Sequence, residues 1–153
     1  MITAVSATRP HRLETHTWRG GILIDDTAAS TPVEVRSSLR VLAELGRGAR
    51  TIAVVGELDV ADDDRLEAHD ALGRIVVRLD ISQLVVVGDG ARHLHAAAGL
   101  EGSWDGESVL VSTPDTAYDF VRATSGEEAV MLITGGARCD LLSLVSRLRE
   151  DSL

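Results

Sequence analysis

Two adjacent aspartates, followed by a loop rich in hydroxyl groups, are the residues of this sequence best suited to bind a ligand. Asp25 and Asp26 come directly after the apolar run 22–24, which has the composition of a buried strand. Ser30 and Thr31 end the loop just before a segment that we expect to be helical. Open α/β sheets bind ligands at the carboxyl ends of their strands, beside helix N-termini. The alternative is that these side chains only turn the chain and cap the helix.

The start of that helix is well defined. Thr31 can accept a hydrogen bond from the third helical N–H, and Glu34 can reach back to the N–H of Thr31. Pro32 lies between them, where the absence of its N–H has no cost. The pattern therefore predicts a helix from Pro32 to Leu45, ended by Gly46.

Histidines offer weaker candidates for chemistry. His69 and Asp70 could form an acid/base pair, but neighbouring side chains diverge on a helix, so ordinary packing is the simpler interpretation. His93 and His95 also point apart at a spacing of two, and no further ligands are evident beside them. We interpret both as surface residues, and the sequence predicts neither a metal site nor a catalytic triad.

Two glycine turns have some likeness to anion-binding loops. Gly135 and Gly136 follow the last predicted strand, and their backbone could hold an anion, although a flexible turn is an equal alternative. Gly88 and Gly90 follow another strand, but His93 stands where a dinucleotide-binding fingerprint has its third glycine. We interpret the second turn as a tight strand-to-helix connection.

Apolar runs alternate with amphipathic segments along the rest of the chain. Continuous apolar runs are typical of parallel strands that are buried on both faces. The sequence therefore predicts an α/β fold, a three-layer Rossmann-like domain with a mainly parallel sheet of about six strands. After a short first strand and a turn at Gly20 and Gly21, the predicted strands cover 22–24, 51–56, 84–88, 109–111 and 129–134. The predicted helices cover 32–45, 65–79, 91–98, 114–122 and 141–149, with Leu66, Leu72 and Val76 on the buried face of the second.

Composition and charge narrow the class of protein. A chain of 153 residues fits one domain, and we expect 1–9 to be a flexible lead-in and 10–153 to be the folded unit. A net charge of −9 argues against nucleic-acid binding, and the complete absence of lysine excludes phosphate loops, Schiff bases and phosphoacceptor receiver domains that need one. The single Cys139 and the lack of a long apolar run predict a cytoplasmic protein without membrane insertion. Trp18 and Trp104 either form a contact face or pack at an edge.

Taken together, several segments resemble the C-terminal domain of Mur ligases, the ATP-dependent amino-acid ligases of peptidoglycan synthesis in the cell wall. The similarity is strongest to the branch that adds D-alanyl-D-alanine to a UDP-muramoyl-tripeptide. It covers nearly the whole chain from about residue 9, and its order and spacing are more specific than any single piece. The segments that carry it are Pro10–Glu14, Ile24–Pro32, Val54–Leu58, His69–Arg74, Leu84–Gly88 and the Gly135–Gly136 turn.

The resemblance implies a domain that closes over a central ATPase domain. In that family an arginine matching Arg12 reaches ATP phosphates, an aspartate matching Asp26 touches the ribose, and the following loop helps to hold the incoming amino acid or dipeptide. On this basis we expect Arg12 and Asp26 to bind nucleotide, and Ser30, Thr31 and His69 to bind substrate. ATP and Mg²⁺ would bind only in an assembly with the central ATPase domain. The expected partners are therefore Mur-ligase N-terminal and central domains, or another protein.

The sequence also departs from the family pattern. Ala28 and Ala29 lie in the loop where the family carries a tyrosine and asparagines, and Thr134 stands where a lysine usually precedes the late glycine turn. The central ATPase domain and the N-terminal UDP-binding domain have no counterpart in these residues, so the domain is not expected to catalyse ligation alone. Two hypotheses stay open. The chain is a ligase domain that works with ATPase and substrate domains elsewhere, or it is a degenerate, non-catalytic binding or assembly module that has kept the fold.

Overall fold

The fold begins with a hairpin whose turn has the chemistry that tight hairpins require. Strands β1 (Glu14–Trp18) and β2 (Gly21–Asp26) pair antiparallel, with Trp18 opposite Gly21. Arg19 and Gly20 make the turn with φ values of 47° and 77°, as expected where both central residues adopt positive φ. The turn is therefore Arg19–Gly20 and not the predicted Gly20–Gly21. Gly21 begins β2, where an added Cβ would lie 2.0 Å from the carbonyl oxygen of Ala129.

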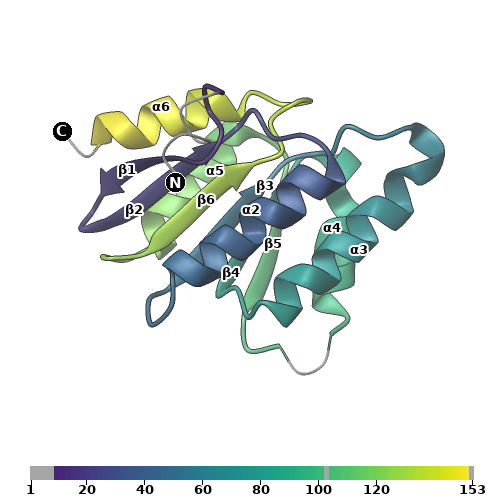
Figure 1. The fold of residues 1–153 in the computed structure, drawn as a ribbon, viewed down its shortest axis with the longest axis horizontal. Coiled ribbons are helices and arrows are strands. Elements are labelled where there is room, and N and C mark those ends of the chain that lie inside the picture. The colour runs from purple at the N-terminus through teal and green to yellow at the C-terminus, as the bar shows by residue number, and fades with distance from the viewer. Residues whose placement is uncertain (1–8, 102–103, 152–153) are drawn as a thin grey trace.

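Figure 1 shows a sheet between two layers of helices, in a computed structural model that describes residues 9–101 and 104–151. The six strands have the order β1-β2-β6-β3-β4-β5, and every pair except β1–β2 is parallel. The remaining strands are β3 (Thr51–Val55), β4 (Gln83–Val87), β5 (Glu107–Val111) and β6 (Val130–Thr134). The predicted α/β class and the mainly parallel sheet are thus confirmed.

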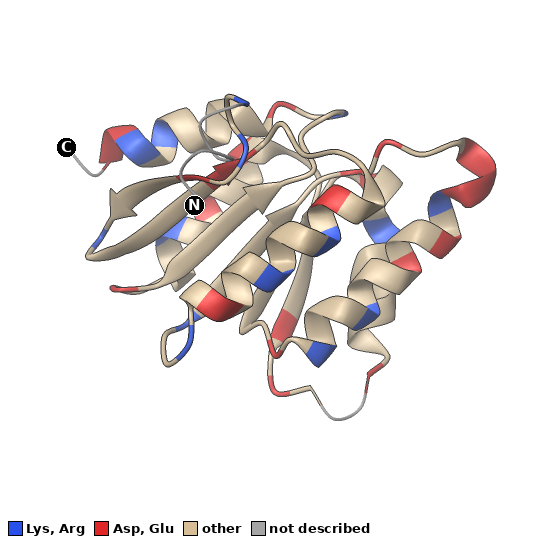
Figure 2. Cartoon of the chain, in the orientation of Figure 1, with Lys and Arg blue, Asp and Glu red and all other residues tan. Residues whose placement is uncertain are grey.

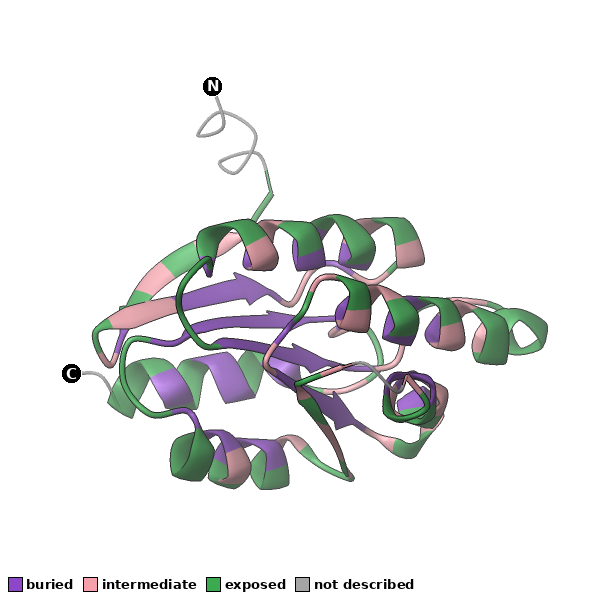
Figure 3. Cartoon of the chain, turned by 90° about the horizontal axis from the view of Figure 1, so that it is seen from below, coloured by how far each residue is buried: buried purple, intermediate pink, exposed green. Residues whose placement is uncertain are grey.

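The helices divide between the two faces of the sheet. One face is covered by α2 (Pro32–Leu45), α3 (Arg65–Arg78) and α4 (Arg92–Gly99), and the other by α5 (Pro114–Thr124) and α6 (Leu141–Asp151) (Figures 1 and 3). Short 3₁₀ turns, η1 (Asp62–Asp64) and η2 (Asp89–Ala91), precede α3 and α4. Each helix of the described chain is too short or too polar to span a bilayer.

Alternation along the strands builds two separate cores. Ile24 packs into the cluster beneath α2, α3 and α4, whereas its neighbour Leu23 packs into the cluster beneath α5 and α6. Trp18 joins the second cluster, is fully buried and donates from Nε1 to the carbonyl oxygen of Leu148 at 2.9 Å. Trp104 likewise bonds the carbonyl oxygen of Ile81 at 3.0 Å. Both tryptophans therefore pack against the domain, and the contact-face alternative is wrong for Trp18.

The sequence located the elements well, with small shifts at their ends. The capping box of Thr31 and Glu34 and the start of α2 at Pro32 are confirmed. Leu66 is 57% exposed, so its predicted place on the buried face of α3 is wrong; Leu72 and Val76 are buried as expected. Most of the predicted lead-in 1–9 lies outside the described residues.

The strand order creates a switch point beside β6. Strand β6 lies between β2 and β3, but the chain leaves β2 and β3 towards α2 and α3 on one face, and leaves β6 towards α6 on the other. Connections that diverge in this way leave a crevice at the carboxyl ends of the strands, where open α/β sheets bind their ligands. The ends of β2, β6 and β3 therefore define the candidate site.

Candidate functional site

Asp26 and Thr134 stand at the centre of this switch point. They are the last residues of β2 and β6, and the parallel register pairs them directly. The hydroxyl of Thr134 donates to Asp26 Oδ2 at 2.7 Å. Both side chains are fully buried. The predicted aspartate thus lies at the expected edge of the sheet, below the surface.

Arg12 is the charged partner of Asp26. It lies in the turn before β1, and its Nη1 donates to Asp26 Oδ1 and, at 3.0 Å, to the hydroxyl of Ser38 on α2. The backbone N–H of Leu13 adds a bond to Asp26 Oδ1 at 3.1 Å. The structure therefore brings the two predicted nucleotide-binding residues together, bonded to each other.

Burial dominates the electrostatics of Asp26. Removal from water raises the pKa of this carboxyl, while hydrogen bonds with Ser38, Thr134 and Arg12, and the charge of Arg12, act in the opposite direction. A buried carboxylate is tolerated only where such donors compensate it. Arg12 supplies the compensating positive charge, and its side chain is 19% exposed, whereas that of Asp26 is not exposed at all.

The loop after β2 is held by its own capping groups. Glu34 Oε1 accepts from the backbone N–H groups of Ser30 and Thr31 at 3.1 and 3.3 Å, and the Thr31 hydroxyl accepts from the N–H of Glu34. Arg9 Nη1 donates to Glu34 Oε2 at 2.5 Å, and Arg9 Nη2 to the carbonyl oxygen of Ala28 at 2.8 Å. These bonds, that from Arg9 above all, lower the pKa of Glu34 to about 2. In this conformation Ser30 and Thr31 cap the helix, and their substrate contact stays a prediction.

The Gly135–Gly136 turn packs against the same loop. Gly135 has φ 78°, and its N–H donates to the carbonyl oxygen of Ala29 at 3.1 Å, so this donor is already used within the chain. An added Cβ at Gly136 would lie 2.6 Å from the carbonyl oxygen of Thr27. The close approach of this turn to the backbone of the loop after β2 explains why glycine occupies it. Anion binding there stays a prediction.

His69 is buried and uses both of its ring nitrogens. Nε2 accepts from the N–H of Leu58 at 3.0 Å, which makes Nδ1 the protonated nitrogen that donates to the carbonyl oxygen of Arg65 at 2.7 Å. Burial is the main cause that lowers the pKa of His69. The packing role that the sequence favoured is thus observed. A substrate contact, which stays a prediction, would have to break one of these two bonds.

Within the described residues, His93, His95 and the second glycine turn form no binding site. His93 and His95 are half-buried on α4, and His95 bonds the hydroxyl of Ser108 at 2.7 Å. Gly88, with φ 96°, leads directly into η2, as the tight-turn interpretation requires.

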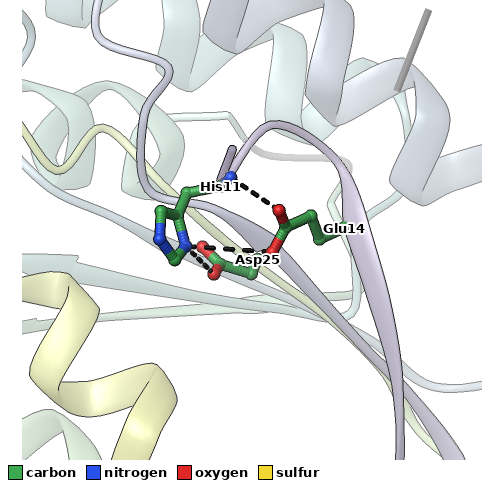
Figure 4. Close-up of side chains that lie close together, drawn as sticks. All are labelled: His11, Glu14 and Asp25. Atoms are coloured by element: carbon green, nitrogen blue, oxygen red, sulfur yellow. Dashed lines mark hydrogen bonds and ion pairs between the residues drawn. The ribbon is translucent and has the colours of Figure 1, made fainter. Parts of the chain in front are cut away.

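One group of polar residues was not predicted. His11, Glu14 and Asp25 meet beside the β1–β2 hairpin (Figure 4). Since side chains alternate along a strand, Asp25 and Asp26 point to opposite faces of β2. His11 Nδ1 lies 2.6 Å from Asp25 Oδ2 and 3.8 Å from Glu14 Oε1. Only the hairpin register, which places Glu14 opposite Asp25, reveals this arrangement.

A family model described as "Mur ligase, glutamate ligase domain" matches residues 11–137. The match includes Arg12, the loop after β2, His69 and the Gly135–Gly136 turn. The chain belongs to the Mur ligase family.

Curated relatives narrow the similarity within the Mur ligases. The UDP-N-acetylmuramoyl-tripeptide–D-alanyl-D-alanine ligase of Mycobacterium leprae (strain TN) is 36% identical over 166 residues, covering 97% of this chain and 32% of that protein. The ligase of the same description from Mycobacterium tuberculosis (strain ATCC 25618 / H37Rv) is 32% identical over 168 residues, covering 98% of this chain and 33% of that protein. The chain thus spans a third, or slightly less, of the length of these Mur ligases.

Solved Mur ligase structures share the fold. MurF from Acinetobacter baumannii superposes with a TM-score of 0.78 at 23% identity, over 92% of this chain and 30% of that one. MurF from Thermotoga maritima, solved in complex with ADP, gives a TM-score of 0.70 at 20% identity, over 94% of this chain and 32% of that one. The three-layer architecture and the homology to MurF are therefore established for this domain.

Proposed function

We propose that this domain is the closing domain of a MurF-like, ATP-dependent ligase, which joins D-alanyl-D-alanine or a related amino acid to a UDP-linked muramoyl peptide. In this role Arg12 contacts the nucleotide phosphates, and the loop Thr27–Thr31 with the start of α2 faces the incoming amino acid or dipeptide. The ATPase and UDP-substrate domains supply the rest of the site, ATP and Mg²⁺ included. The activity belongs in the cytoplasm, where the single, half-buried Cys139 would stay reduced.

The observation that carries the proposal is the environment of Arg12. Its guanidinium lies at the switch point, is held from beneath by Asp26, and keeps part of its surface accessible. A guanidinium has five N–H donors, and within the described residues Arg12 donates only from Nη1. Planar donors that stay available are well suited to phosphate oxygens.

The charge distribution supports the same location for a phosphate. Three aspartates form η1, Asp62–Asp64, which is the continuous acidic segment at the right of Figure 2. A polyanion would be repelled from that side and attracted to Arg12 at the switch point. Asp26 acts in this proposal by fixing Arg12. Its contact with the ribose would require the donors on its oxygens to move away.

Nucleotide binding in a complete ligase tests the proposal. A chimera would carry residues 10–153 in place of the matching third of the M. tuberculosis ligase, and its thermal unfolding would be followed with and without ATP-Mg. A ligand that binds the native state at 100 times its dissociation constant stabilises it by about 2.7 kcal/mol. We expect a clear rise of the midpoint that is reduced by Arg12→Ala.

Arg92→Ala is the matched control for that experiment. Arg92 is an exposed arginine on α4 that bonds to the nearby Asp89. The control should respond to ATP-Mg as the unchanged chimera does. An equal response of the Arg12→Ala and Arg92→Ala chimeras would contradict the proposed phosphate contact.

A second function is favoured by the loop after β2. Ala28 and Ala29 bring no hydrogen-bonding side chains to it, Ala29 is fully buried, and Glu34 already occupies the N–H groups of Ser30 and Thr31. Such a loop suits a non-catalytic binding or assembly module that has kept the fold. That function predicts that the domain itself is well folded, does not respond to ATP-Mg or D-alanyl-D-alanine, and has a stable protein partner. Isolation of the chain as a monomer without a co-purifying protein would count against it.

A further inference from the structure

A histidine and two carboxylates converge on the side of the hairpin that the proposed nucleotide role does not use (Figure 4). His11 lies in the turn before β1, Glu14 begins β1, and Asp25 lies in β2. One potential ligand atom from each residue lies within 4.8 Å of the other two. The group therefore combines one imidazole nitrogen with two carboxylate oxygens at a single point.

The strand register forces the two carboxylates together. Glu14 is directly opposite Asp25 in the antiparallel pair, and the side chain of Asp25 is only 1% exposed. Like charges directly opposite each other destabilise a sheet. A cation between them removes that repulsion, and the nearest candidate within the described chain is the imidazole of His11, 2.6 Å from Asp25.

Each carboxylate has one oxygen fixed by donors and the other turned towards His11. Asp25 Oδ1 accepts from the N–H and hydroxyl of Thr27 at 3.1 and 2.8 Å. Glu14 Oε2 accepts from the backbone N–H of His11 at 2.9 Å. Asp25 Oδ2 and Glu14 Oε1 then lie 2.6 and 3.8 Å from His11 Nδ1. Hydrogen bonds that orient the ligands from outside are a regular feature of metal sites.

We propose that His11, Glu14 and Asp25 bind one divalent transition-metal ion, for which Zn²⁺ is the best representative. Tetrahedral zinc with bonds of about 2.0–2.1 Å holds its ligand atoms roughly 3.3 Å apart, so small movements of these side chains suffice. An imidazole ligand favours zinc over Mg²⁺, which prefers oxygen ligands alone. The side chains of His11 and Glu14 are 42% and 35% exposed, which leaves an open side for a water ligand. The ion would fasten the turn that carries Arg12 to β2.

Titration of the metal-free full chain with ZnCl₂, followed by calorimetry, tests the site. We expect one zinc ion per chain, and X-ray absorption of the loaded protein should show nitrogen and oxygen ligands without sulfur. His11→Gln and Glu14→Gln should each weaken zinc binding by more than about tenfold, since loss of an outer partner alone has that effect. Both substituted side chains are partly exposed, and Gln at position 14 can still accept from the N–H of His11, so the fold should persist.

Two matched variants test whether zinc binds at another histidine or at the thiol. His95→Gln removes a half-buried histidine on α4, and Cys139→Ser removes the single thiol; both should bind zinc as the unchanged protein does. The proposal is overturned if the unchanged chain binds no zinc at millimolar concentration. It is equally overturned if Glu14→Gln and His11→Gln keep full affinity, or if Cys139→Ser abolishes binding, because an adventitious thiol site would then be the cause.

Discussion

Arg12 and Asp26 form an ion pair in which only the arginine reaches solvent. The Asp26 carboxylate is completely buried at the end of β2, while the side chain of Arg12 is 19% exposed. The family resemblance implied two separate contacts, of Arg12 with phosphate and of Asp26 with ribose. In the structure the two residues are bonded to each other, and the buried Asp26 fixes the position of Arg12.

Removing the arginine should destabilise the domain strongly. Arg12→Met leaves Asp26 buried without its positive partner, and loss of one member of a buried pair costs about 3 kcal/mol or more. Arg12→Met/Asp26→Asn should recover part of that loss because the uncompensated charge is gone. Urea denaturation measures both, with the exposed Arg92→Met as control, expected to change stability by less than about 0.5 kcal/mol. If Arg12→Met unfolds at the same urea concentration as the control, the pair does not stabilise the fold.

Glu34 should make stability depend on acidic pH. Its pKa falls from 4.5 to about 2 in the folded protein, mainly through Arg9 and the N–H of Ser30. The unfolded chain therefore takes up the proton first, and the stabilisation, complete above pH 4.5, is lost as the pH falls towards 2. Glu34→Gln should reduce the dependence of the thermal midpoint on pH across this range. Glu44 is exposed near the end of the same helix, and Glu44→Gln should leave that dependence unchanged. Parallel curves for Glu34→Gln and the unchanged protein would refute this role.

His69 should add a second pH dependence at higher pH. Burial lowers its pKa below the ordinary 6.5, so the unfolded chain binds the proton more readily. The contribution of His69 is complete above pH 6.5 and is lost as the pH falls towards the folded value. Protonation of Nε2 also removes the acceptor for the N–H of Leu58. The difference in unfolding free energy between the unchanged protein and His69→Gln should therefore shrink from about pH 7 to pH 5; a constant difference would argue against it.

The contact between the β3 and β6 turns should tolerate no side chain. A Cβ at Gly56 would lie 2.4 Å from the carbonyl oxygen of Gly135 and 2.9 Å from Cys139 Sγ. Gly56→Ala should destabilise the domain by about 1–3 kcal/mol, the usual effect of overpacking. Gly99→Ala is the matched control, since nothing lies within 4 Å of its Cβ position and alanine favours the end of α4. Equal urea midpoints for the two variants would show that the turns can separate freely.

Local signals explain why the fold could be predicted. Thr31, Pro32 and Glu34 determine the start of α2 by themselves, because capping depends only on neighbours in the sequence. The buried parallel strands were equally clear from their continuous apolar runs. Leu66 shows the limit: it lies six residues before Leu72, a spacing that places it off the buried face of a helix with 3.6 residues per turn.

The site depended on contacts between distant segments. Arg12 and Asp26 could be selected by resemblance, but their mutual bond requires the turn before β1 to fold back over β2. The group of His11, Glu14 and Asp25 follows from the hairpin register, which places Glu14 opposite Asp25. The turn was predicted at Gly20 and Gly21 instead of Arg19 and Gly20, so this register was not apparent from the sequence. Sequence spacing carries no information on such pairs until strand register is known.

The most direct measurement is the rate of ATP-dependent ligation by the M. tuberculosis chimera, with UDP-muramoyl-tripeptide and D-alanyl-D-alanine as substrates. We expect a measurable rate that falls by at least about tenfold in Arg12→Ala, corresponding to about 1.4 kcal/mol of lost transition-state stabilisation, and stays unchanged in Arg92→Ala. A folded chimera that ligates equally well with and without Arg12 would contradict the proposed role of Arg12 in binding the nucleotide.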